Sequence, residues 1–352
     1  MATKIVKVSR QSPNADYLLQ AADIIKDGGL VIIPTETVYG IAADGSNPDA
    51  VRKLDAIKQR PDSKPYSVHI DEKEKLEGFV KEVPVAAYKL MDQFWPGPLT
   101  MIFKAVAGGT IGVRLPDDAI ARRIIMLADV AVVCPSANIS GRTPPVVFAD
   151  ALKDLKDKVD FAVDAGDTAV QKESSVVDVT VKPVAVLREG AISKRDILKA
   201  ASTTTVLFVC TGNSCRSVMA QALLQKKLRD IKRADVEVLS AGIMMADGLG
   251  ASYETTELLA AEGIDVSKHR SARVTKDMLN RSDLILVMEG SQEHRILQMH
   301  PSVKNRLFLL KEFARVDGND LNISDPMGRD MRFYERTYGI IKEAVEKVSQ
   351  II

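Results

Sequence analysis

The sequence predicts an α/β protein of two domains, because the chain is long, apolar β-rich runs alternate with helical stretches, and the pattern changes near residue 203. Its 352 residues exceed the ~250–300 over which a single hydrophobic core usually grows. Hydrophobic residues make up 46% and charged residues 27%, a balance that is typical of globular proteins. We therefore expect one domain over residues 1–203 and a second over residues 204–352.

The first of these domains shows a mixed α/β pattern. A helix over 14–27 begins at Asn14, and a pair of glycines ends it before a buried strand at 30–33. Further strands are predicted at 66–70, 99–103, 130–134, 161–165, 175–179 and 184–189, and further helices at 47–58, 84–93 and 117–128.

The second domain shows a more regular alternation, which begins after a Ser/Thr-rich stretch near residue 203. Strands are predicted at 206–210, 236–240, 284–288 and 306–310, and helices at 217–229, 252–262, 291–299 and 331–349. Alternating elements of these lengths predict a small doubly wound sheet of four parallel strands.

Composition disfavours several classes of protein. No run of about 18 apolar residues is present, so we expect no membrane span. The first residues lack the apolar core of a secretory signal, and the three cysteines are an odd number, so we expect a cytoplasmic protein without a disulfide framework. Acidic and basic side chains balance in residues 1–200, which disfavours a general polyanion binder.

The segment VCTGNSCRS places Cys210 and Arg216 with five residues between them, after a buried strand and before a helix. Backbone N–H groups at a helix start favour a bound phosphate, and Arg216 can add a bidentate pair of hydrogen bonds. The same positive environment favours a thiolate at Cys210 that attacks phosphorus. Ser217 is placed to hydrogen-bond this thiolate, and Asn213 to brace the loop.

Phosphate transfer to a thiolate also needs an acid for the leaving group. Asp325, in ISDPMGRD, is the candidate, because a loop position leaves its carboxyl free. A cysteine that follows a strand is otherwise most often an inert core residue. The arginine at fixed spacing and the distal Asp-Pro pair favour the catalytic interpretation.

The segments VLFVCTGNSCRS, SAG (240–242), DLILVM (283–288) and SDP (324–326) resemble the low-molecular-weight protein-tyrosine phosphatases. The resemblance implies hydrolysis of phosphotyrosine in a phosphoprotein, with a phosphocysteine intermediate at Cys210 and with Asp325 as acid and then base. It also implies a redox-protective role for Cys215, which matches a second thiol that can form a disulfide with Cys210. The alternative is that Cys215 is a loop residue without a specific function.

The phosphatase substrate stays open. Ser214 is small and polar where tyrosine-specific members often carry a larger aliphatic residue, and protein-arginine phosphatases of this family carry threonine there. Met327 stands where an aromatic wall often lies, and Val218 where proline is usual. Phosphoarginine is therefore the alternative to phosphotyrosine, and small phosphate esters remain possible.

Polar clusters follow several strands of the first half, and in open α/β sheets ligands collect beyond strand ends. The clusters include PTETVYG (34–40), KQRPDSKP (58–65), PSANISG (135–141), ESSVVD (173–178) and LREG (187–190). Lys58, Arg60 and Lys64 offer three cations suited to polyphosphate, although a solvated helix end is the alternative from charge alone.

Together these clusters resemble the threonylcarbamoyl-AMP synthase family over about residues 5–200, which implies a YrdC-like open α/β domain with a twisted mixed sheet. The resemblance implies formation of threonylcarbamoyl-AMP from L-threonine, bicarbonate and ATP, with Mg²⁺ on the triphosphate, for the threonylcarbamoyladenosine modification of tRNA with partner proteins. The implied threonine-binding residues are Thr35, His69, Arg114 and Ser175. The implied ATP-binding residues are Lys58, Arg60, Ser136, Asn138 and Arg188.

A carbamate formed from threonine and bicarbonate can itself attack the α-phosphorus, so the protein needs position and positive charge rather than a nucleophile. Cys134 is therefore interpreted as a core residue, and no protein ligands for a metal are assigned. An RNA-binding module without adenylate synthesis is the alternative. Carbamoyl-phosphate-using transferases share the core, but this chain lacks their acylphosphatase and zinc-finger-like segments.

Overall fold

The structure is a computed structural model that describes residues 2–59, 65–244, 248–316, 318 and 320–352. The chain divides into two compact units, one ending at Ala201 and the other beginning at Ser202. Each unit contains its own β-sheet and its own hydrophobic core, and each is described separately.

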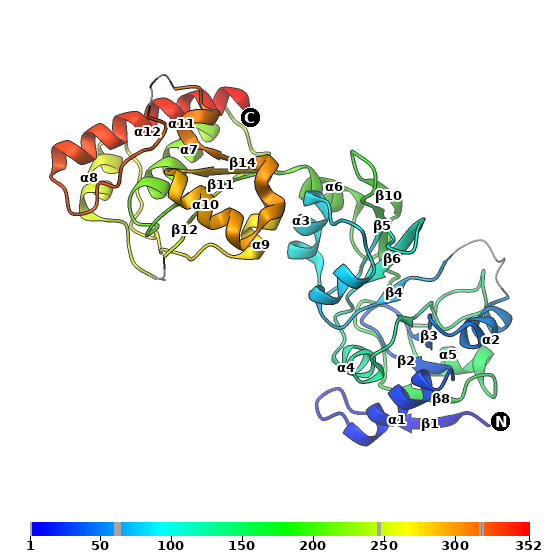
Figure 1. Cartoon of the computed structure of the whole chain (residues 1–352). Coiled ribbons are helices and arrows are strands. Elements are labelled where there is room, and N and C mark those ends of the chain that lie inside the picture. The colour runs from blue at the N-terminus through cyan, green and yellow to red at the C-terminus, as the bar shows by residue number, and fades with distance from the viewer. Residues whose placement is uncertain (1, 60–64, 245–247, 317, 319) are drawn as a thin grey trace. The chain divides into compact units, whose positions relative to one another are not determined.

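The first unit is built on a ten-stranded sheet in the order β1-β8-β2-β3-β7-β4-β6-β5-β9-β10 (Figure 1). Its strands are β1 (Lys4–Lys7), β2 (Val31–Ile33), β3 (Gly40–Asp44), β4 (Val68–His69), β5 (Leu99–Lys104), β6 (Thr110–Arg114), β7 (Val132–Val133), β8 (Phe161–Asp164), β9 (Ser175–Asp178) and β10 (Ala185–Arg188). Parallel and antiparallel pairs both occur: β4 pairs β6 in parallel, whereas β5 pairs β6 antiparallel. The predicted mixed sheet is confirmed.

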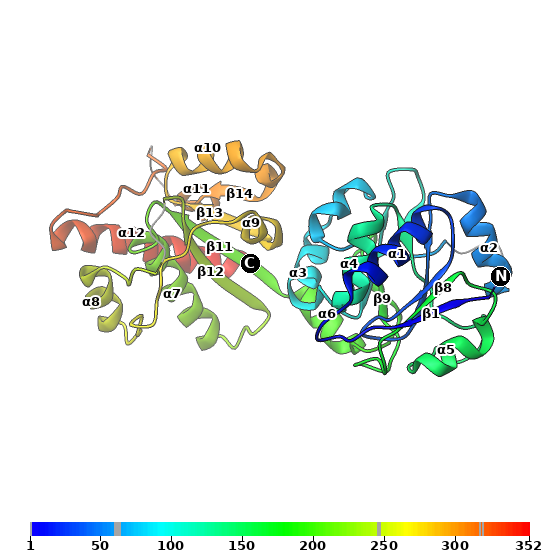
Figure 2. The ribbon, with the colours of Figure 1, turned by 90° about the horizontal axis from the view of Figure 1, so that it is seen from below.

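Helices cover both faces of this sheet. They are α1 (Ala15–Lys26), α2 (Pro48–Lys58), α3 (Val85–Phe94), α4 (Ala119–Ala128), α5 (Phe148–Leu155) and α6 (Lys194–Ser202), with a 3₁₀ turn at Lys73–Gly78. On β2, Val31 and Ile33 belong to the core cluster under α1 and α4, which lie side by side (Figure 2), whereas Ile32 belongs to the cluster under α2 and α3. This alternation is the two-residue period of a strand buried on both faces.

The second unit contains the predicted four-stranded parallel sheet, in the order β12-β11-β13-β14. Its strands are β11 (Thr204–Cys210), β12 (Val236–Gly242), β13 (Leu284–Val287) and β14 (Leu307–Leu309). Its helices are α7 (Arg216–Asp230), α8 (Tyr253–Ala261), α9 (Lys276–Arg281), α10 (Gly290–Met299), α11 (Leu310–Phe313) and α12 (Met331–Ile351), with a 3₁₀ turn at Pro301–Arg306.

The two faces of the central strand β11 are both buried, which explains its uninterrupted apolar sequence. Phe208 packs in the cluster that contains α7 and α12, whereas Leu207 and Val209 pack in the cluster that contains α9 and α10. Figures 1 and 2 show these two pairs of helices on opposite faces of the sheet. The doubly wound arrangement places the loop after β11 at the carboxyl edge of the sheet, where ligands of such folds bind.

In the part of the chain that the structure describes, no helix combines the length and the apolar character needed to cross a membrane.

Candidate active sites

The loop between β11 and α7 surrounds the sulfur of Cys210. The Ser217 Oγ lies 3.0 Å from the Cys210 Sγ, and the backbone N–H of Asn213 donates to the same sulfur at 3.3 Å. The Cys210 side chain is buried, with 2% of its surface exposed. Hydrogen-bond donors at these distances stabilise a sulfur anion, which is the form that acts as a nucleophile.

Asn213 fixes the shape of this loop. Its φ of 53° lies in the left-handed region, where asparagine is one of the few non-glycine residues found regularly. The Asn213 Nδ2 donates to Ser217 Oγ at 3.0 Å and to Ser240 Oγ at 2.8 Å, and its Oδ1 accepts from the backbone N–H of Ala272 at 2.9 Å. The side chain thus joins the loop to α7, to the end of β12 and to the segment that follows α8.

Gly242, which ends the SAG motif, passes directly beneath the same loop. A Cβ atom at this position would lie 2.9 Å from the Thr211 carbonyl oxygen and 3.0 Å from the Asn213 backbone nitrogen. Backbone cannot yield as a flexible side chain can, so the close approach requires glycine. The SAG motif therefore supports the loop from below.

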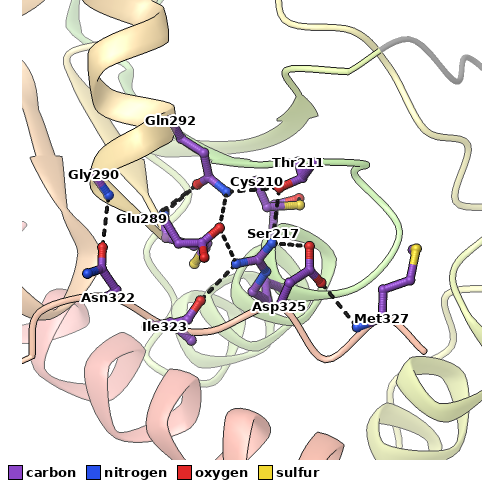
Figure 3. A network of polar contacts seen from close by, with 12 residues as sticks. Cys210, Thr211, Ser217, Glu289, Gly290, Gln292, Asn322, Ile323, Asp325 and Met327 are labelled. Atoms are coloured by element: carbon purple, nitrogen blue, oxygen red, sulfur yellow. Dashed lines mark hydrogen bonds and ion pairs between the residues drawn. The ribbon is translucent and has the colours of Figure 1, made fainter. Parts of the chain in front are cut away.

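Arg216 is buried, with 1% of its surface exposed, and carboxylates hold it from two sides. The Arg216 Nη1 lies 2.8 Å from Glu289 Oε2 and 2.8 Å from the Ile323 carbonyl oxygen, and Nη2 forms an ion pair with Asp325. Figure 3 shows Glu289 and Asp325 flanking Cys210 and Ser217. The Arg216 Nε is buried without a hydrogen-bond partner, so it can donate to an anion in the loop.

Sequence reasoning missed Glu289 and Gln292, which lie where β13 leads into α10. The Gln292 Nε2 donates to Thr211 Oγ1 at 3.2 Å and to Glu289 Oε2 at 3.1 Å, and its Oε1 accepts from the Met288 backbone N–H at 2.9 Å (Figure 3). The sequence did contain one signal for Glu289, which is a carboxylate shortly after a buried strand. Residues that follow parallel strands meet at the carboxyl edge of the sheet.

Cys215 points into the core of the second unit. Its Sγ lies 3.5 Å from the hydroxyl of Tyr334 on α12 and 3.5 Å from the Ser214 Oγ. Cys210 and Cys215 are both free thiols in the structure. A protective disulfide between them stays a prediction.

In the first unit, seven of the nine predicted ligand residues line a single cavity of about 480 Å³. They are Thr35, Lys58, His69, Arg114, Ser136, Asn138 and Arg188. Arg60 lies outside the described residues.

Ser175 does not belong to the described lining of this cavity, whereas its neighbour Ser174 does. The Ser175 Oγ donates to the Ile192 carbonyl oxygen at 2.6 Å and accepts from the backbone N–H groups of Gly190 and Ile192 at 2.9 and 3.0 Å. These bonds join β9 to the segment after β10. The strand alternation explains the difference, because adjacent residues face opposite sides.

Lys58 ends α2, lines the cavity and holds the PSANISG loop. Its Nζ donates to the carbonyl oxygens of Ser136 and Asn138 at 2.7 and 2.6 Å. The Asn138 Nδ2 donates to the Arg142 carbonyl oxygen at 2.6 Å, while its Oδ1 is buried without a partner. A cation and an unsatisfied amide oxygen therefore lie on neighbouring residues of the cavity lining.

Arg114 and His69 lie beside each other in the lining of the cavity, because β4 and β6 pair in parallel with these two residues in register. The Arg114 Nη2 donates to Glu36 Oε1 at 2.7 Å and to Thr37 Oγ1 at 2.8 Å. The Thr35 Oγ1 lies 2.9 Å from the Thr37 Oγ1. Sequence reasoning missed Glu36 and Thr37, although both belong to the PTETVYG motif.

Known proteins resemble each unit. Residues 23–190 match the Sua5, YciO and YrdC family model, described as telomere recombination, and residues 205–352 match the model described as low molecular weight phosphotyrosine protein phosphatase. A threonylcarbamoyl-AMP synthase of Pyrococcus abyssi is 35% identical over 212 residues, which cover 58% of this chain and 62% of that protein. The "Probable low molecular weight protein-tyrosine-phosphatase EpsP" of Ralstonia solanacearum is 41% identical over 142 residues, which cover 40% of this chain and 91% of that protein.

The chain belongs to both families, one in each unit. The fold of the Sua5/YrdC unit agrees with a crystal structure of P. abyssi Sua5 complexed with L-threonine, at a TM-score of 0.54 and 25% identity, covering 68% of this chain and 92% of that one. The chain spans less than two thirds of the P. abyssi relative matched in sequence.

Cations outnumber anions among the charged side chains that line the Sua5/YrdC cavity. Lys58, Arg114, Arg142 and Arg188 line it, and the acidic residue of its described lining is Glu173. Glu173 pairs with Arg188, whose Nη1 lies 2.8 Å from the Glu173 Oε1. The excess of positive charge favours an anionic ligand. Arg142 was not predicted, because a single arginine in a turn has no distinguishing pattern.

Cys134 lines the same cavity, and burial raises the pKa of its thiol to about 12. The thiol is therefore protonated at neutral pH and is a poor nucleophile. Its position against Gly40, where an added Cβ would lie 2.3 Å from the sulfur, indicates close packing.

Burial, together with the neighbouring Arg114 guanidinium, lowers the pKa of His69 to about 3. The folded unit thus excludes a proton that an unfolded histidine takes up below its usual pKa of 6.5. We expect the free energy of unfolding of the Sua5/YrdC unit to fall as the pH decreases from about 6.5 towards 3, by up to ~1.4 kcal/mol per pH unit.

Calorimetric unfolding of the full chain across this pH range measures the effect. In His69→Gln, the number of protons taken up when the first unit unfolds should decrease by about one. His294→Gln, at an exposed position in the second unit, should leave this number unchanged. An unaltered pH dependence in His69→Gln would show that other groups cause it.

Proposed function

We propose that the chain joins two enzymes, a threonylcarbamoyl-AMP synthase over residues 1–203 and a protein phosphatase over residues 204–352. The observation that carries the first activity is the single cavity lined by Arg114, neutral His69 and Lys58, in which cations outnumber anions. The Cys210 sulfur, surrounded by donors beside the buried Arg216, carries the second. The names of the relatives in each family agree with both activities.

In the synthase, Arg114 would bind the threonine carboxylate, with Thr35 and His69 beside it. His69 is neutral, so it would contact the amino acid without adding charge. Ser174, which precedes β9 and lines the cavity, would contact the ligand in place of Ser175. The ATP ligands would be Lys58, Arg60, Ser136, Asn138 and Arg188.

The threonine nitrogen attacks bicarbonate carbon, and loss of water gives a carbamate. A carbamate oxygen then forms a bond to the α-phosphorus of ATP while the bond between that phosphorus and the α–β bridging oxygen breaks, so pyrophosphate leaves. Mg²⁺ enters on the ATP substrate and neutralises charge on the leaving pyrophosphate. The cations of the cavity hold the charged groups in place.

Pyrophosphate release by the purified chain tests this activity. Release should require ATP, L-threonine and bicarbonate together, and omission of any one should abolish it. The alternative, an RNA-binding module, predicts that the chain binds tRNA and releases no pyrophosphate above background. A cytoplasmic location and partner proteins that pass the threonylcarbamoyl group to tRNA belong to this proposal.

In the phosphatase, the Cys210 thiolate attacks the phosphorus of a phosphate ester and forms a phosphocysteine. Arg216 would bind the phosphoryl oxygens, and Asp325 would protonate the leaving ester oxygen. Water then attacks the phosphocysteine, Asp325 takes its proton, and phosphate leaves. Ser217 and Asn213 would stabilise the thiolate in both steps.

The substrate of the phosphatase is proposed to be protein phosphotyrosine, with phosphoarginine as the alternative. Turnover of phosphotyrosine peptides, phosphoarginine peptides and a small phosphate ester by the full chain separates these classes. A kcat/KM that is at least about tenfold higher for the phosphoarginine peptides would make phosphoarginine, instead of phosphotyrosine, the proposed substrate.

Asp325→Asn is expected to lower kcat by ~100-fold to 10,000-fold on phosphotyrosine peptides, because the leaving oxygen then departs without a proton. The decrease should be much smaller with p-nitrophenyl phosphate, whose leaving group is stable as an anion. Asp330→Asn is the matched control, because Asp330 caps α12 in the same loop and asparagine caps equally well. Equal losses on both substrates in Asp325→Asn would exclude the acid role.

A further inference from the structure

Glu36 and Arg114 form an ion pair inside the Sua5/YrdC unit. The side chains are each 6% exposed, and the Arg114 Nη2 lies 2.7 Å from the Glu36 Oε1. Arg114 lines the cavity, whereas Glu36 lies behind it and does not belong to the described lining. The carboxylate therefore acts on the arginine from the protein side.

The described hydrogen bonds of Arg114 involve a single nitrogen of its guanidinium group. Both of its described hydrogen bonds, to Glu36 and to Thr37 Oγ1, run from Nη2. The Arg114 Nε and the Glu36 Oε2 are buried without hydrogen-bond partners. A guanidinium can pair with a carboxylate through two parallel hydrogen bonds, so this pair is held at one point only.

The surroundings make Glu36 the main counter-charge for Arg114. His69, the register partner of Arg114 across β4 and β6, is neutral because burial lowers its pKa to about 3. A buried guanidinium without a partner is strongly unfavourable, so the arginine needs a fixed carboxylate to remain in this place before a ligand arrives.

We propose that Glu36 is a positioning residue for the amino-acid end of the cavity. It fixes Arg114 through Nη2, with Thr37 as a second anchor, and leaves the other donors of the guanidinium for the carboxylate of the incoming amino acid. This inference rests on the proposed synthase function. Glu36 should therefore affect the binding of the amino acid and not the binding of ATP. The reason is that, among the described residues, Glu36 contacts Arg114 and does not contact Lys58.

Steady-state pyrophosphate release by the full chain tests the assignment. Glu36→Gln keeps the size of the side chain and removes its charge. We expect its KM for L-threonine to rise by at least about tenfold, with the KM for ATP changed by less than about threefold. Glu36→Asp keeps the charge and should recover part of the loss. Thr37→Val removes the second anchor and should raise the threonine KM by a smaller factor.

Glu82→Gln is the matched control, because Glu82 also pairs with a cation of the first unit, Lys104, and neither residue belongs to the described lining of the cavity. Its threonine KM should stay within about threefold of the wild-type value. A merely structural role of Glu36 would lower kcat and raise both KM values together, so the selective change separates positioning from general damage.

Two results would overturn the inference: an unchanged threonine KM in Glu36→Gln, or equal increases in the threonine and ATP KM values. If Glu36→Gln does not fold, Thr37→Val, which removes the other described partner of Arg114 Nη2, decides by the same two criteria. A wild-type chain that releases no threonine-dependent pyrophosphate would instead contradict the synthase function itself. Wild-type activity together with unaltered Glu36 variants would contradict the role of Glu36 alone.

Discussion

Replacing Cys210 by serine is expected to reduce phosphatase turnover by at least ~1,000-fold, because a serine hydroxyl is not ionised at neutral pH and cannot form the phosphocysteine. The donors from Ser217 and the Asn213 backbone, at 3.0 and 3.3 Å, stabilise a thiolate and cannot ionise an alcohol. Threonine-dependent pyrophosphate release should stay at the wild-type rate, because the two units have separate sheets and cores.

Cys215→Ser is the matched control for this variant. Cys215 lies at the N-cap of α7, at the end of the loop that Cys210 begins, but points towards Tyr334 in the core, so its replacement should leave most of the turnover intact under reducing conditions. Under peroxide, peptide mapping of the wild-type chain should find a bond between Cys210 and Cys215 if the redox-protective role holds. Retained turnover in Cys210→Ser would contradict the phosphocysteine mechanism.

Lys58→Ala is expected to lower kcat/KM for ATP by ~100-fold or more, because it removes a buried cation from the cavity and frees the loop that it holds. The Lys58 Nζ donates to the carbonyl oxygens of Ser136 and Asn138, two further residues of the proposed ATP site. Phosphatase turnover should remain unchanged. Titration of the variant with ATP and steady-state pyrophosphate release measure the effect.

Lys53→Ala controls for loss of a lysine from α2. Lys53 is exposed, and its Nζ donates to the Gly28 carbonyl oxygen at 2.9 Å, away from the described lining of the cavity. It should keep wild-type kcat/KM. Unchanged nucleotide affinity in Lys58→Ala, or an equal loss in Lys53→Ala, would remove Lys58 from the proposed site.

The sequence was sufficient for the elements with a strong pattern. The helix capped by Asn14, the apolar strand β11 and the long helix α12 all lie where the periodicity predicts them. The strands β1, β3 and β6 were missed. β3 reads GIAAD, and its small residues have little β-propensity, so tertiary packing determines its conformation. β6 begins among exposed residues, which weakens its apolar pattern.

The residues of the candidate sites likewise divide into those that the sequence pattern predicted and those that only the fold brings together. Cys210 and Arg216 lie on one continuous segment, so their spacing alone indicated their proximity. Glu289 was not predicted, because it meets Arg216 only through the order of strands β11 and β13 in the sheet. Glu36 is next to a predicted ligand residue, but its role depends on Arg114, which the topology brings from 78 residues away.

The proposal of two independent active sites on one chain is tested most directly by assaying wild type, Cys210→Ser and Lys58→Ala for both pyrophosphate release and phosphatase turnover. Each variant should lose one activity and keep the other: Cys210→Ser should lose only the phosphatase, and Lys58→Ala only the synthase. A folded variant that loses both activities, or a wild-type chain that has only one, would contradict the account.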